Sequence, residues 1–165
     1  MKSYQEERLQ YALETARCFG ITYIDQYGKS HDSKPTRDAI DICRVFRKYR
    51  FTNYAVETHT NSLTGIYCDK AGLKKVIEAL GLDHREQVIL KIQQKYILLF
   101  KHPLYEITNN LTLAKNVILL KDDSLIPMKG SKLIGDHNQY YDVELIGDIA
   151  ETPEFPEELE GFINV

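Results

Sequence analysis

The residues of this chain that are best suited to binding chemistry are four closely spaced cations, interleaved with aromatic side chains. The cations are Arg44, Arg47, Lys48 and Arg50. The first three stand three and four residues apart, so a helix would place them on one face. A cationic face attracts phosphates, and a neighbouring ring, here Tyr49 or Tyr54, can stack on a base. This basic helix at residues 44–50 therefore predicts a nucleic-acid-binding or nucleotide-binding surface.

The same cluster also has a purely structural interpretation, which stays open. Asp38 and Asp41 precede the cations in the same expected helix. Acids in the first turns and bases in the last turns complement the helix dipole. Arg37 and Arg44 also have the spacing for ion pairs with Asp41. On this interpretation the cations only form a solvated helix face.

A second candidate site is the polar segment at residues 57–62, which contains His59 and Glu57. A histidine titrates near neutral pH and can act as a general base beside a carboxylate. The wider motifs of enzymes are missing, however: there is no glycine-rich phosphate loop, GxSxG, HExxH or zinc-ligand spacing. We therefore expect a protein without catalytic function, metal or cofactor, and we keep a hydrolase or nuclease centred on His59 as an alternative.

The third candidate is the acidic C-terminal segment, residues 151–165, which carries five Glu, two Pro and no Lys or Arg. It is either a disordered tail or an extended arm anchored by aromatic side chains. Residues 1–82 hold 13 Lys and Arg against 10 Asp and Glu, whereas residues 83–165 hold 8 against 14. Such asymmetry favours a basic partner for the arm. Its contact residues would be Glu154, Phe155, Glu157, Glu158 and Glu160.

These features together favour a small cytosolic binding protein that acts on a macromolecule, most simply another protein, as an adaptor or an inhibitor. The eleven tyrosines are compatible with an interface, and hence with a homodimer, because a tyrosine ring buries area while its hydroxyl stays polar. The composition is compatible with a phage or mobile-element protein. A nucleic-acid or nucleotide binder that uses residues 44–50 is the alternative.

Length and composition set the frame for these hypotheses. A chain of 165 residues suits one domain, here residues 1–150, followed by the acidic arm. Three widely separated cysteines are typical of free thiols in a reducing compartment. The first ten residues are too polar for a signal peptide, and no apolar run reaches the length of a membrane span, so we expect a cytoplasmic protein without membrane contact.

The elements that position these residues are predicted to form an α+β fold. A helix capped by Ser3 and ended by Gly20 precedes a strand at 21–25 and a second helix at about 35–49. Strands at 53–57 and 64–68 alternate in polarity and are predicted to pair as a β-hairpin. A third helix begins after Asp69 and ends at Gly81.

The most apolar stretch, residues 83–101, is predicted to be a central buried helix. Asp83 and Glu86 have the spacing of a capping box, and the apolar residues recur at three and four positions. The alternative is a hairpin of VILKI and YILLF joined through residues 93–95. After it, short runs at 116–121, 124–128, 132–135 and 140–146 predict a C-terminal antiparallel β-meander with an acidic tail.

Overall fold

The computed structural model describes residues 3–30, 34–49, 52–101, 111–114, 116–120 and 124–156. These residues form an α+β fold, so the predicted fold class is confirmed. The helices are α1 (Tyr4–Ala16), α2 (Ala39–Lys48) and α3 (Lys70–Leu80), with 3-10 turns at His84–Glu86, Asp136–Asn138 and Ile149–Glu151. The strands are β1 (Ile21–Ile24), β2 (Asn53–Glu57), β3 (Leu63–Asp69), β4 (Val88–Ile92), β5 (Lys95–Lys101), β6 (Leu111–Ala114), β7 (Val117–Leu120), β8 (Leu125–Pro127), β9 (Lys132–Ile134) and β10 (Tyr140–Ile146). No helix in this part of the chain has the length and apolar character needed to cross a bilayer.

The three helices begin at side chains that cap them. Ser3 and Asp69 each accept a hydrogen bond from a backbone amide three residues further on, which satisfies an N–H group that lacks a helical partner. The second helix begins later than predicted, because Asp38 caps it. Gly81 ends α3 with a φ of 63°, a left-handed conformation that glycine adopts at little cost.

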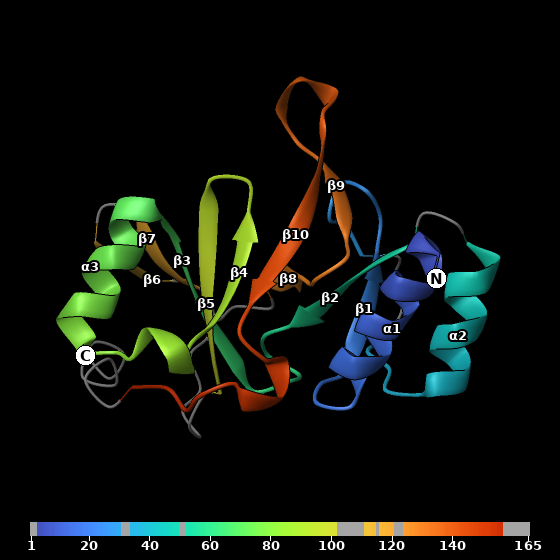
Figure 1. Cartoon of the computed structure of the whole chain (residues 1–165), viewed down its shortest axis with the longest axis horizontal. Helices are drawn as coiled ribbons and strands as arrows, with labels where there is room; N and C mark the ends of the chain where they lie inside the picture. The colour runs from blue at the N-terminus through green and yellow to red at the C-terminus, as the bar shows by residue number, and fades with distance from the viewer. Residues whose placement is uncertain are drawn as a thin grey trace.

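The strands form two antiparallel sheets. The small sheet has the order β1-β2-β8, and the large sheet has the order β6-β7-β3-β5-β4-β10-β9. In Figure 1, α3 lies at one end of the molecule and α1 and α2 lie at the other, with the sheets between them. Every residue of β1 is buried, so both faces of the small sheet are covered along this strand.

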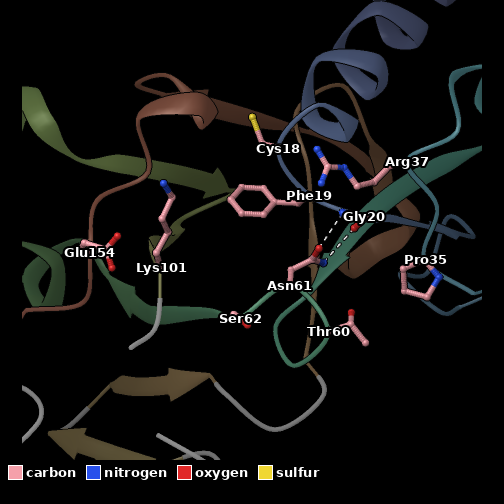
Figure 2. Close-up of a pocket in the computed structure, with 10 residues that line it drawn as sticks. All are labelled: Cys18, Phe19, Gly20, Pro35, Arg37, Thr60, Asn61, Ser62, Lys101 and Glu154. Carbon is pink, nitrogen blue, oxygen red and sulfur yellow. Dashed lines mark hydrogen bonds between the residues drawn. The ribbon is translucent and has the colours of Figure 1, made fainter. Parts of the chain in front are cut away.

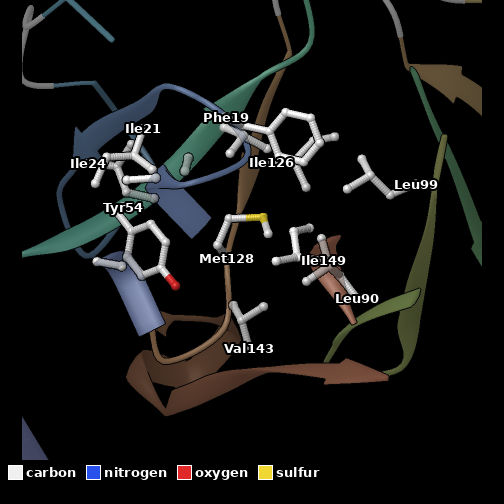
Figure 3. Close-up of a cluster of buried hydrophobic side chains, with 14 of the residues drawn as sticks. Phe19, Ile21, Ile24, Tyr54, Leu90, Leu99, Ile126, Met128, Val143 and Ile149 are labelled. Atoms are coloured by element: carbon white, nitrogen blue, oxygen red, sulfur yellow. The ribbon is translucent and has the colours of Figure 1, made fainter. Parts of the chain in front are cut away.

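The main core lies between the two sheets and α1. Figure 3 shows side chains from both sheets converging on it, including Ile21 of β1, Ile126 of β8 and Leu90 of β4. Gly65 of β3 lets the sheets approach, because an added Cβ atom would lie 2.9 Å from Ile97 Cγ2 and 3.2 Å from Ile126 Cδ1. A second apolar cluster covers the other face of the large sheet, under α3.

The predicted central helix at 83–101 is wrong, and the hairpin alternative is correct. Only residues His84–Glu86 form a helical turn, and β4 and β5 then pair in register from Val88↔Leu99 to Ile92↔Lys95. Burial alternates along β5: Leu99 faces the main core, whereas Leu98 and Phe100 face the second cluster. Because this hairpin is buried on both faces, its sequence is apolar almost throughout, and that pattern does not distinguish a strand from a buried helix.

The predicted hairpin of residues 53–57 and 64–68 is also wrong, although both strands exist. β2 pairs with β1 and β8 in the small sheet, while β3 pairs with β5 and β7 in the large sheet. The chain passes from one sheet to the other at the turn between β2 and β3. The two strands are therefore neighbours in sequence but belong to different sheets, and each pairs with strands from distant parts of the chain.

The predicted C-terminal meander needs a similar correction. The four expected runs do contain the strands β7, β8, β9 and β10. Of these, only β9 and β10 pair with each other, while β7 joins β3, β8 joins β2 and β10 joins β4. The strands of the C-terminal half therefore complete sheets that the first half begins.

Candidate functional site

The cations of α2 differ in their accessibility to a ligand. Arg44 forms an ion pair with Asp41, with 2.6 Å between Nη2 and Oδ1, and Asp41 also accepts a hydrogen bond of 2.8 Å from the Tyr23 hydroxyl. The bonds from Arg44 and then Tyr23 lower the pKa of the Asp41 carboxyl. Arg47 and Lys48 are exposed in the last turn. Arg44 therefore has the structural role of pairing with Asp41, whereas Arg47 and Lys48 are accessible to a ligand.

The two tyrosines predicted to stack on bases lie in different environments. Tyr49 is exposed, and the Lys48 ammonium lies 5.3 Å from its ring centroid. Tyr54 is 0 % exposed, and its hydroxyl donates to the carbonyl of Lys129 at 2.7 Å. Tyr54 is therefore a core residue with no face open to a base. Arg50 lies outside the described residues.

The histidine candidate lies in the exposed turn between β2 and β3. Among the described residues, the His59 imidazole forms no hydrogen bond or ion pair, and no group of three metal-ligating side chains occurs. Glu57 ends β2 and is half-buried. The turn thus does not bring a base and an acid together in hydrogen-bonding geometry around His59.

Beside this turn lies a polar pocket of about 590 Å³. Its lining residues are Cys18, Phe19, Gly20, Pro35, Arg37, Thr60, Asn61, Ser62, Lys101 and Glu154. Figure 2 shows the Asn61 amide bonded to both backbone groups of Gly20, at 2.7 Å and 3.0 Å. Arg37 donates to the carbonyls of Ala16 and Arg17 at the end of α1. The hydrogen-bonded side chains of this pocket, Asn61 and Arg37, therefore connect segments of the chain, and neither is a nucleophile or a base.

The acidic arm is part of the fold as far as residue 156. The amide of Lys101 donates to the carbonyl of Pro153, and the amide of Phe155 donates to the carbonyl of Lys101, both at 2.7 Å. The Phe155 ring is buried against Phe100, with 6.0 Å between centroids. Phe155 is therefore an anchor and not a contact for a partner. Glu154 is exposed, and Glu157, Glu158 and Glu160 lie outside the described residues.

A second pocket, which the sequence does not predict, lies between α1 and the β9–β10 hairpin. It has a volume of about 450 Å³, within the range of small-ligand sites, and we name it the Tyr4–Tyr140 pocket. Its lining residues are Tyr4, Gln5, Arg8, Gln26, Asn53, Lys132 and Tyr140. Tyr4 and Tyr140 are 50 % and 56 % exposed, so both rings are open to solvent and to a ligand.

Arg8 is the buried charge of this pocket, with only 5 % of its surface exposed. Its Nε donates to the carbonyl of Gly130 at 2.8 Å, and its Nη2 donates to Asn53 Oδ1 at 2.7 Å and to the carbonyl of Thr52. Burial lowers the pKa of its guanidinium from the ordinary value, and nearby Tyr4 is the largest influence that opposes this. Arg8 thus contributes positive charge while its donors hold α1 to β2 and to the chain after β8.

Cations lie over aromatic rings throughout this region. Lys132 Nζ lies 5.7 Å from the Tyr4 centroid, and Arg8 Cζ lies 5.7 Å from the same centroid and 6.0 Å from that of Phe46 in α2. The contact with Phe46 links the pocket to the last turn of α2. A hollow of about 370 Å³ adjoins Tyr4 and Arg8, and there Lys129 lies 4.2 Å from the Tyr11 centroid.

One sequence signal points to this pocket. Arg8 stands four residues before Ala12, on the stripe of α1 that also buries Thr15 and Ala16. A charge on a buried stripe indicates a polar partner in the core or a functional site. Tyr4, Lys132 and Tyr140 carry no such signal, because they come together only through pairing of distant strands.

Comparison with known proteins adds no relative: no protein-family model matches this chain, and no curated protein matches it.

Proposed function

We propose that this protein binds single-stranded nucleic acid through a tyrosine–cation surface, defined as Tyr4, Tyr49, Tyr140, Lys48 and Lys132, with Arg47 beside it. The observation that carries the proposal is the placement of cations over rings. All five cation–ring contacts among the described residues involve rings of α1, Phe46 or the adjacent Tyr49.

This combination matches what a single strand presents. Bases of any kind stack on aromatic rings, and the phosphates between them attract lysine and arginine. Tyr4, Tyr49 and Tyr140 are each about half exposed, so each ring keeps surface that a base can reach beside the cations over Tyr4 and Tyr49. Arg47 and Lys48 extend the positive charge along α2, and Arg8, packed on Phe46, connects the two parts.

Salt dependence of binding tests the proposal. A labelled single-stranded oligonucleotide is titrated with the full-length protein at several salt concentrations, with fluorescence anisotropy as the readout. The logarithm of the binding constant should fall linearly with the logarithm of the salt concentration, by about 0.7 for each phosphate contact on a single strand.

A charge-reversal pair with a matched control locates the surface. Arg47→Glu with Lys48→Glu should weaken binding and reduce the salt slope by about 1.4, the value for two lost contacts. Lys74→Glu with Lys75→Glu changes the charge equally on exposed positions of α3, at the other end of the molecule, and should have a much smaller effect. Equal losses in both pairs, or no binding at low salt, would contradict the proposal.

A second candidate function is an adaptor or inhibitor that binds a basic protein through the acidic C-terminal segment. The exposed Glu154 beside the buried Phe155 favours it, because the anchored arm presents an acid at the surface. Truncation after Pro156 removes Glu157, Glu158 and Glu160 and keeps the Phe155 anchor. The truncated protein should unfold at the same temperature and lose its partner from lysate; retained capture would refute this role.

A further inference from the structure

We infer that the Tyr4–Tyr140 pocket holds one base of the bound strand and prefers bases that carry a carbonyl oxygen, namely thymine, uracil, guanine and cytosine, over adenine. This inference rests on the proposed binding of single-stranded nucleic acid. In this pocket one base would be selected by its hydrogen-bonding groups. The rest of the tyrosine–cation surface would stack on bases and attract phosphates without distinguishing one base from another.

The pocket has the volume and the aromatic lining residues to hold a planar ring. Its volume of about 450 Å³ suits a single nucleotide, and Tyr4 and Tyr140 line it from α1 and from β10. The Tyr140 hydroxyl lies 3.4 Å from Gln26 Oε1, which ties this ring to the loop after β1. The two walls therefore belong to elements far apart in sequence that the fold holds together.

The deepest polar groups of the pocket are already engaged. Asn53 is buried, and its amide oxygen accepts from Arg8 and, at 2.9 Å, from the backbone amide of Lys132. Its amide nitrogen donates to the carbonyl of Lys132 at 2.8 Å. These groups form a rigid floor that carries the positive charge of Arg8, and they do not read the base.

Two of the remaining polar groups can only donate, whereas Gln5 and the Tyr4 hydroxyl can donate or accept. Gln26 Oε1 takes the Tyr140 hydroxyl, which leaves its Nε2 group to donate, and Lys132 offers an ammonium. Within the described residues neither of these two donors has a protein acceptor. Two donors above a positive floor favour a carbonyl oxygen. Adenine has none and presents an amino group, which is itself a donor.

The path of the strand beyond the pocket follows from the same contacts. Arg8 lines the pocket and packs on Phe46 in the last turn of α2, the turn that also carries Arg47 and Lys48. Phosphates next to the held base would therefore meet these cations, and the next base would meet Tyr49, where Lys48 lies over the ring.

Base preference and wall variants test the inference on the full-length protein. Labelled oligo-dT and oligo-dA of twelve nucleotides are titrated at one salt concentration, and oligo-dT should bind about tenfold more tightly, since a well-placed polar contact discriminates by about 1–3 kcal/mol. Gln26→Glu replaces one of the two donors by an acceptor and should reduce this ratio, because only Lys132 still donates to the base. A ratio that is unchanged in the variant would refute the preference.

The stacking wall is tested by Tyr140→Ala, which should weaken oligo-dT binding about tenfold, whereas Tyr140→Phe should keep the affinity. Tyr27→Ala is the control, because Tyr27 is an exposed tyrosine that does not line the pocket. If salt-dependent binding is present but Tyr140→Ala behaves like Tyr27→Ala, the pocket inference fails and the proposed function stands. If no oligonucleotide binds, both fail together.

Discussion

Arg8 shows at the scale of one residue how a charge is kept inside a small domain. Its guanidinium donates to two backbone carbonyls and to Asn53, and these acceptors belong to segments 44 to 122 residues away in sequence. A buried ion is costly to desolvate, and only such a set of hydrogen bonds offsets that cost. Arg8 therefore joins three distant segments of the chain at one point.

Replacing Arg8 should destabilise the whole domain. Arg8→Met keeps most of the apolar stem but removes the donors to the carbonyls of Gly130 and Thr52 and one donor to Asn53 Oδ1, so we expect a loss of about 3 kcal/mol in the free energy of unfolding. Arg17→Met is the matched control, because Arg17 is exposed at the end of α1 and its side chain makes no such bonds. Urea titration of both variants measures the difference. Equal midpoints would show that Arg8 has no structural role.

The Asp41 carboxylate gives a prediction on pH. Its hydrogen bonds to Arg44 and Tyr23 hold its folded-state pKa below the ordinary value of 3.8. A depressed folded pKa stabilises the fold above the unfolded pKa, and this stabilisation is lost as the pH falls through the folded value. Asp41→Asn should therefore cost up to about 1 kcal/mol at pH 7, as expected for a surface pair, and this cost should shrink as the pH falls below 3.8 and through the lower folded pKa. Thermal unfolding of both proteins across this range measures it, and a pH-independent difference would contradict the assignment.

At the scale of elements, the β4–β5 hairpin turns at Gln93, which has a φ of 56°. The pair Ile92↔Lys95 closes a loop of two residues, and only the first of them has a positive φ, as in a type II′ turn. Glycine is the usual residue at that position, because it adopts a left-handed conformation without strain. The protein thus places glutamine where a type II′ hairpin usually has glycine.

Gln93→Gly should therefore stabilise the protein. The substitution removes a strain of about 1 kcal/mol and leaves the paired strands unchanged. Gln94→Gly is the control, because residue 94 lacks a positive φ and gains only the unfolded-state entropy of glycine, which is unfavourable. Differential scanning calorimetry should show a higher melting temperature for the first variant and a lower one for the second. The reverse order would contradict the turn assignment.

The sequence predicts the elements whose ends are set by local side chains. Side chains that act locally, such as the caps Ser3 and Asp69 and the stop at Gly81, are visible in the sequence and give α1 and α3 correctly. The hairpin at 88–101 lacks the Asn-Gly or Asp-Gly pair that is typical of a tight turn. Because both of its faces are buried, its apolar residues also fit the spacing of a buried helix. The Tyr4–Tyr140 pocket cannot be predicted from the sequence for a different reason, because Tyr4 and Tyr140 line the same pocket only after distant strands have paired.

At the scale of the whole molecule, the close approach of the two sheets depends on the missing side chain at Gly65. Gly65→Val would push side-chain atoms toward Ile97 of β5 and Ile126 of β8, and overpacking of this kind costs about 1–3 kcal/mol. Glu144→Val is the control, because it places the same side chain on an exposed position of β10 in the same sheet. Chemical unfolding compares the variants. A Gly65→Val protein as stable as the control would show that the sheets can separate at this point.

The pairing of β2 with β8 has a consequence for synthesis of the chain on the ribosome. β2 lies at residues Asn53–Glu57, yet its partner Leu125–Pro127 emerges about seventy residues later. Until then β2 is an open edge, the small sheet is incomplete, and α1 and α2 have only part of the surface on which they pack. The N-terminal half therefore cannot complete its fold before the C-terminal half is synthesised. The nascent chain stays accessible to chaperones and proteases through most of its translation.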